Sequence, residues 1–179
     1  MMMVLFAALW GFGEASLFFV VPDVLISFVA VRYGLTKALM LGGFAALAAA
    51  MAGAFMAYWG ASDAEAAIAM LAQIPAIEEA LIEATRTRLA EDGYWAVLSG
   101  AVTGVPYKIF AVLAGEAGWS IFAFALISIP IRFCRFALTA ALAGLVGRIL
   151  VAGIGMRWAL AALCGFWILL YAYYFNAIG

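Results

Sequence analysis

Five charged side chains lie inside long apolar stretches of the chain, where ionised groups are costly. They are Glu14, Asp23, Lys108, Arg132 and Arg135. On insertion scales a charge near the bilayer centre costs about 2.5 to 3.5 kcal/mol, so such side chains usually face a polar cavity or a partner. We interpret these five residues as a substrate-binding and transport site. The alternative is that they pair with one another as structural ion pairs.

Arg132 and Arg135 have the spacing expected of a phosphate site. Three positions apart on a helix, they share one face, and Pro130 can kink that helix just before them. Each guanidinium can donate two parallel hydrogen bonds to a phosphate group, which a lysine cannot do. The pair therefore predicts binding of a phosphate-bearing molecule.

Glu14 and Asp23 are acids in a single apolar segment. Burial favours the neutral form of a carboxyl group, whereas a neighbouring arginine favours the carboxylate. Either acid could therefore exchange a proton during a transport cycle, which makes protons a candidate coupling ion.

Composition indicates that the bilayer is the solvent of this protein. Of its 179 residues 70% are hydrophobic and 11% are charged, and the mean hydropathy is +1.18. The net charge of −1 excludes a polybasic surface for nucleic acid. The chain has no histidine, and we interpret Cys134 and Cys164 as small buried hydrophobic residues, so we predict no metal site and no cofactor.

Two of the hydrophobic segments, 3–31 and 94–117, contain residues that break helices. Pro22 interrupts the first segment, and Gly104 and Pro106 interrupt the second. A proline inside a helix costs about 3 kcal/mol or more, and in lipid the freed backbone groups need partners within the protein. We predict a re-entrant helical hairpin in each segment, whose prolines leave N–H groups aimed at the centre, where an anion is favoured. Two kinked spanning helices are the alternative.

The chain also contains a weak internal repeat. A shift of 84 positions places Pro22 on Pro106 and Gly34 on Gly118. The shared order is a proline, an apolar arm, a glycine and a long apolar helix, as expected of a duplicated unit of one hairpin and one crossing helix. Because each unit crosses once, the second must enter from the opposite face. This arrangement is the inverted repeat found in many transporters.

We therefore predict an all-α integral membrane protein with a single membrane domain over residues 1–179. It comprises a hairpin-plus-helix repeat at 1–60, extramembrane amphipathic helices at 61–93, a second repeat at 94–150 and a C-terminal transmembrane helix at 151–179. Spanning helices need about 20 apolar residues for a core of about 30 Å.

Charged residues predict which side each connection faces. The bases Arg32, Lys37, Arg148 and Arg157 fall on one side of this scheme. The connection 61–93 carries seven acids against two arginines and falls on the other side with the C-terminus. The excess of basic residues places the first side in the cytoplasm.

Several short motifs occur in a recognisable order: FGEAS at 12–16, VPD at 21–23, GVPYK at 104–108, AGEAGW at 114–119 and RFCRF at 132–136. This order resembles the DedA family, also called SNARE-associated or VTT-domain proteins, over about residues 5 to 150. The resemblance implies two opposed re-entrant hairpins and translocation of polyprenyl phosphates or phospholipids, with proton coupling in some members. Tyr107 and Lys108 stand where many members have a Gly-Arg pair.

The resulting expectation is a non-enzymatic flippase or scramblase of a phosphate-bearing lipid in a bacterial inner membrane. Its partners would be membrane lipids and protons. The sequence leaves open whether the protein forms a homo-oligomer. A secondary transporter of a small solute or ion is the alternative, since it would share the hairpins. A lipid-modifying enzyme is disfavoured because the sequence lacks histidine and a Gly-x-Ser-x-Gly nucleophile elbow.

Overall fold

The computed structural model describes residues 2–178, and its regular secondary structure over that range is entirely α-helical. The helices are α1 (Met2–Ser16), α2 (Asp23–Tyr33), α3 (Leu35–Ser62), α4 (Ala64–Leu71), α5 (Glu79–Asp92), α6 (Tyr94–Thr103), α7 (Tyr107–Glu116), α8 (Ile121–Ile154) and α9 (Met156–Ile178). The all-helical prediction is confirmed for this part of the chain.

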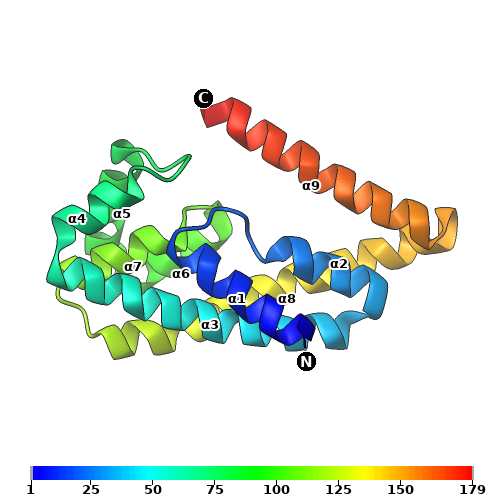
Figure 1. The fold of residues 1–179 in the computed structure, drawn as a ribbon, viewed down its shortest axis with the longest axis horizontal. Coiled ribbons are helices and arrows are strands. Elements are labelled where there is room, and N and C mark those ends of the chain that lie inside the picture. The colour runs from blue at the N-terminus through cyan, green and yellow to red at the C-terminus, as the bar shows by residue number, and fades with distance from the viewer. Residues whose placement is uncertain (1, 179) are drawn as a thin grey trace.

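Within the described residues, three helices are long and apolar enough to cross a membrane: α3, α8 and the Met156–Tyr174 part of α9. At 1.5 Å per residue, the 28 residues of α3 extend about 42 Å and the 34 residues of α8 about 51 Å, more than a hydrocarbon core requires. Figure 1 shows α3 and α8 side by side and running in opposite directions. The chain therefore has the helices of an integral membrane protein.

Both Pro-containing segments break where the sequence places their prolines. Pro22 immediately precedes α2, and Pro106 immediately precedes α7. Gly104 ends α6 in the left-handed conformation at φ 87°, which a side chain would strain. The helix order α1, α2, α3 thus parallels the order α6, α7, α8.

Small residues bring the helices of both breaks into close contact with α3. A Cβ atom added at Gly11 of α1 would overlap the backbone of Ala45, and one at Gly115 of α7 would overlap the carbonyl oxygen of Ala57. Close backbone approach at small residues is typical of membrane helices, because lipid supplies no hydrophobic drive for their association. The alanines and glycines of α3 therefore set the positions of α1 and α7.

The acidic connection folds back onto the bundle. Leu71 of α4 and Ile82 and Leu89 of α5 are buried in the same core cluster as α7. Arg86 of α5 pairs with Glu116 at the end of α7. The two short helices therefore cap the end of the molecule opposite the α8–α9 turn (Figure 1).

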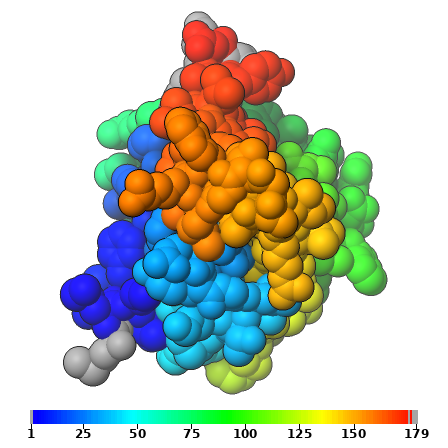
Figure 2. All heavy atoms as spheres, turned by 90° about the vertical axis from the view of Figure 1, so that its right-hand side faces the viewer, coloured from blue at the N-terminus to red at the C-terminus, as the bar shows by residue number. Residues whose placement is uncertain are grey.

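The α2–α3 turn and the α8–α9 turn lie together at the other end. Figure 2 views this end and shows α9 and the last part of α8 beside the α2–α3 segment. Gly147 of α8 approaches Val31 of α2 there. The bases of these two turns consequently share one end of the molecule, as the charge pattern predicts, and the acidic connection occupies the other (Figure 1).

α9 contacts the bundle along one face, through Ala159, Trp167 and Tyr171, and leaves most of its described side chains exposed. Cys164 on α9 and Cys134 on α8 are both free and exposed. The prediction that they are buried was wrong, because an apolar membrane helix has faces that meet lipid instead of protein.

Candidate functional site

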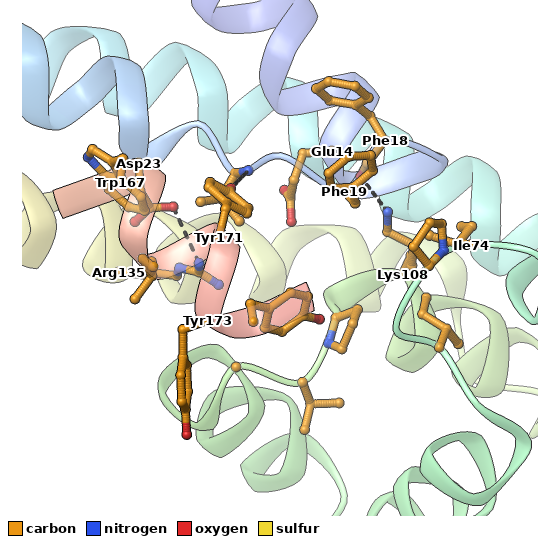
Figure 3. Close-up of a pocket in the computed structure, with 18 residues that line it drawn as sticks. Glu14, Phe18, Phe19, Asp23, Ile74, Lys108, Arg135, Trp167, Tyr171 and Tyr173 are labelled. Carbon is orange, nitrogen blue, oxygen red and sulfur yellow. Dashed lines mark hydrogen bonds and ion pairs between the residues drawn. The ribbon is translucent and has the colours of Figure 1, made fainter. Parts of the chain in front are cut away.

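A cavity of about 390 Å³ lies where the two helix breaks meet α9. The α1–α2 break contributes Phe18, Phe19 and Val21, and the α6–α7 break contributes Gly104, Val105 and Pro106. Across from them stand Trp167, Leu170, Tyr171, Tyr173 and Tyr174 of α9. Segments far apart in the sequence therefore build one chamber (Figure 3).

Four of the five predicted charges line this chamber: Glu14, Asp23, Lys108 and Arg135. Figure 3 shows Lys108 on one side, the Asp23–Arg135 pair on the other, and Glu14 between them. The fifth, Arg132, lies behind the wall and reaches the chamber only through Glu14. Of the helix breakers, Gly104 and Pro106 line the chamber, whereas Pro22 is buried beside it.

Lys108 joins the two breaks. Its Nζ donates a hydrogen bond of 2.6 Å to the backbone carbonyl of Phe18, 90 residues away. The residue is only 2% exposed, and within residues 2–178 it forms no ion pair. A buried ammonium has three N–H donors. The described contacts leave the charge of Lys108 without a carboxylate of its own.

Arg132 is held in a closed environment. Its guanidinium pairs with Glu14, and a second contact joins Nη1 to Oε1 at 3.5 Å. The same group lies 4.9 Å from the ring centre of Tyr107 and 5.2 Å from that of Phe136, which are cation–π distances. Arg132 therefore orients Glu14 from within the protein and is shielded from the chamber.

Arg135 is more open. Its Nη2 lies 3.3 Å from Oδ2 of Asp23, and its side chain is 25% exposed, against 2% for Arg132. Thr139 donates a hydrogen bond of 2.6 Å to the other carboxylate oxygen of Asp23. Thr139 was missed from sequence, although its position four residues after Arg135 places it on the same helix face.

The structure also assigns α9 a part in the site that the sequence did not suggest. Tyr171 accepts the backbone N–H of Val21 at 2.9 Å, which is one of the donors freed by the first break. Trp167 donates to Ser27 of α2 at 2.9 Å. The spacing of four between Trp167 and Tyr171 is the signal that could have identified this face of α9.

Chemically, the chamber can bind an anion. The four charged side chains that line it, Glu14, Asp23, Lys108 and Arg135, sum to zero. Both carboxylates accept contacts from arginines, Glu14 from Arg132 behind the wall and Asp23 from Arg135, which leaves Lys108 without an ion pair among the described residues. Among residues 2–178 no group of three or more side chains is suited to hold a metal ion.

Comparison with known proteins does not identify a function for this site. No family model, curated protein or solved structure matches the chain. The residues of the chamber are therefore the basis for inferring a function.

Proposed function

We propose that this protein moves a phosphate-bearing lipid, such as a polyprenyl phosphate or a phospholipid, across a membrane by flipping or scrambling it. The observation that carries the proposal is Lys108, a buried cation without an ion-pair partner among the described residues, in a chamber formed by two helix breaks. The nearby carboxylate of Glu14 is already paired with Arg132, so an anionic headgroup would give the buried ammonium of Lys108 a partner of its own. The protein acts as a transporter and not as an enzyme.

In this proposal α1–α2 and α6–α7 are re-entrant hairpins of an inverted repeat. Their arms have 15, 11, 10 and 10 residues, or about 15 to 22 Å at 1.5 Å per residue, which is too short for a hydrocarbon core of about 30 Å. Irregular backbone at membrane depth is tolerated where it lines a polar cavity, and both breaks line this chamber. On the same proposal the protein is a member of the DedA family, which the order of its sequence motifs resembles, and lies in a bacterial inner membrane.

Two carboxylates make proton coupling part of the same proposal. Glu14 and Asp23 both line the chamber, and each forms an ion pair with an arginine. These ion pairs could form and break as the acids lose and gain a proton. A secondary transporter of a small anion is the second candidate, favoured by a chamber of only about 390 Å³. An uptake assay separates it from a lipid translocase.

The test is translocation by the purified chain in liposomes, measured with a fluorescent phospholipid and with a polyprenyl phosphate. We expect Lys108→Gln to slow translocation about tenfold or more, because a hydrogen bond to a charged group is worth about 1.5 to 3 kcal/mol. Lys37→Gln is the matched control, since Lys37 is exposed at the basic end of the molecule. Its rate should equal that of the parent.

Two results would reject the assignment. Uptake of inorganic phosphate without movement of either lipid would favour the small-anion transporter. Lipid movement by Lys108→Gln at the parental rate would show that the chamber is not where the headgroup passes.

A further inference from the structure

A second hollow of about 440 Å³ lies between α8 and α9, with α2 at its base. We call it the α8–α9 groove. Its wall on α8 includes Leu142, Val146 and Leu150, and its wall on α9 includes Ala162, Leu163 and Phe166. No charged residue is among those that line it. Its lining therefore suits hydrocarbon and excludes an ionic headgroup.

The polar end of the groove adjoins the charged chamber. Trp167 lines both spaces, and its indole N–H is bonded to Ser27 at the groove floor. Thr139 lines the groove while its hydroxyl donates to Asp23, which lines the chamber. From Trp167 the groove runs along α9 to Ala159, about 12 Å at 1.5 Å per residue. A charged space and an apolar space thus meet end to end.

We propose that the α8–α9 groove holds one hydrocarbon chain of the lipid whose phosphate lies in the chamber. This inference rests on the proposed function and adds the subsite for the tail. An amphiphile matches both spaces at once, with its anionic end at Lys108 and Arg135 and its apolar chain beyond Trp167. Trp167 stands at the junction and positions the point where the headgroup ends and the chain begins.

The tail cannot select the groove by hydrophobicity alone, because bulk lipid chains are as apolar as its lining. Binding of the headgroup instead tethers the chain next to the groove and raises its effective concentration there. Occupancy of the groove by the transported lipid should therefore depend on the phosphate and on Lys108. A neutral lipid should enter it no more often than it meets other lipid-facing surfaces.

The experiment uses the full chain in phosphatidylcholine vesicles that contain a trace of a probe lipid with a photoactivatable diazirine in its tail. One probe is phosphatidic acid and the other is diacylglycerol, which lacks the phosphate. After illumination, cross-linked residues are located by mass spectrometry. We expect phosphatidic acid to label groove residues several-fold more than diacylglycerol does, and Lys108→Gln to remove that excess.

A matched pair of variants tests the position. Ala162→Trp places an indole in the groove and should reduce labelling by phosphatidic acid there. Ala161→Trp places the same group on the neighbouring outer surface, where Ala161 is exposed and does not line the groove, and should leave labelling unchanged.

Equal labelling of the groove by both probes would overturn the inference, because it would identify the occupant as bulk lipid. Labelling by phosphatidic acid elsewhere, together with Lys108-dependent translocation in liposomes, would reject the groove and leave the proposed function standing. Absence of both the phosphate-dependent labelling and lipid translocation would reject the two together.

Discussion

At the scale of single residues, Arg132 and Arg135 differ in their surroundings although they are three positions apart on α8. Arg132 is enclosed between aromatic rings and paired with Glu14. Arg135 is partly open to the chamber and shares Asp23 with Thr139. The two arginines that were predicted to bind phosphate together therefore have different roles. Arg132 supports the site from within the protein, and Arg135 can contact a headgroup.

We predict that Arg135→Lys slows lipid translocation by roughly tenfold, the effect of losing a charge-assisted hydrogen bond worth about 1.5 kcal/mol. Lysine keeps the charge but lacks the rigid planar fork with which a guanidinium can bond Asp23 and a phosphate in one fixed geometry. The liposome assay measures the rate, and thermal unfolding in detergent should be unchanged. Arg148→Lys at the basic end is the control; equal slowing of both variants would place Arg135 in the scaffold.

We also predict that Glu14→Gln is strongly destabilising. The substitution leaves the guanidinium of Arg132 buried without its carboxylate, and breaking a buried pair costs about 3 to 5 kcal/mol. Glu14→Gln combined with Arg132→Met removes both charges and should recover much of the loss. Thermal unfolding of the purified variants measures this. A double variant no more stable than Glu14→Gln would contradict the structural role of Arg132.

At the scale of helices, the chamber depends on how closely the broken segments approach α3. Gly115 fixes α7 against Ala57, and Gly11 fixes α1 against Ala45. Residues at these two contacts place Lys108 and Glu14, which are carried by the same helices. The spacing of α1 and α7 from α3 therefore determines where Glu14 and Lys108 lie in the chamber.

We predict that Gly115→Ala destabilises the protein by about 1 to 3 kcal/mol, the usual cost of overpacking. The added methyl group would overlap the backbone of Ala57, which cannot move without shifting α3. Gly153→Ala on α8 is the control, because no atom of the described residues lies within 4 Å of its added Cβ. Unfolding temperature in detergent measures both, and a neutral Gly115→Ala would show that α7 is free to shift.

At the scale of the whole molecule, charge is separated between the two ends. The turns that carry Arg32 and Arg157 adjoin at one end, and α4 and α5 with their acids cap the other. The two long helices join these ends. This polarity matches a protein that crosses the membrane along its long axis.

We predict that the basic end is cytoplasmic, by the positive-inside rule. With Cys134 and Cys164 replaced by alanine, Gln73→Cys in the acidic connection, where the side chain is exposed, should react with a membrane-impermeant maleimide in intact cells. Thr36→Cys, exposed just after the α2–α3 turn, should react only after the membrane is opened. The reverse pattern would invert the topology.

The sequence alone determined the local features of this protein. The composition indicated that the protein lies in a membrane. The helix breaks follow from Pro22 and Pro106, because proline lacks an N–H and clashes with the preceding turn wherever it occurs in a helix. The five charges could be singled out because an ionised group in an apolar segment is conspicuous without any knowledge of its neighbours. The inverted repeat and the transported lipid stay predictions.

The tertiary structure decided which of these residues meet. Arg132 pairs with Glu14 across 118 positions of the sequence, and Arg135 pairs with Asp23 across 112. Nothing in the local sequence pattern indicates that Arg132 pairs with Glu14 instead of with Asp23. The structure also brought α9 to the chamber through Tyr171 and left both cysteines exposed. The physical reason is that lipid and protein interior are equally apolar, so hydrophobicity cannot tell a helix face that packs from one that meets the bilayer. Only side-chain packing makes that choice.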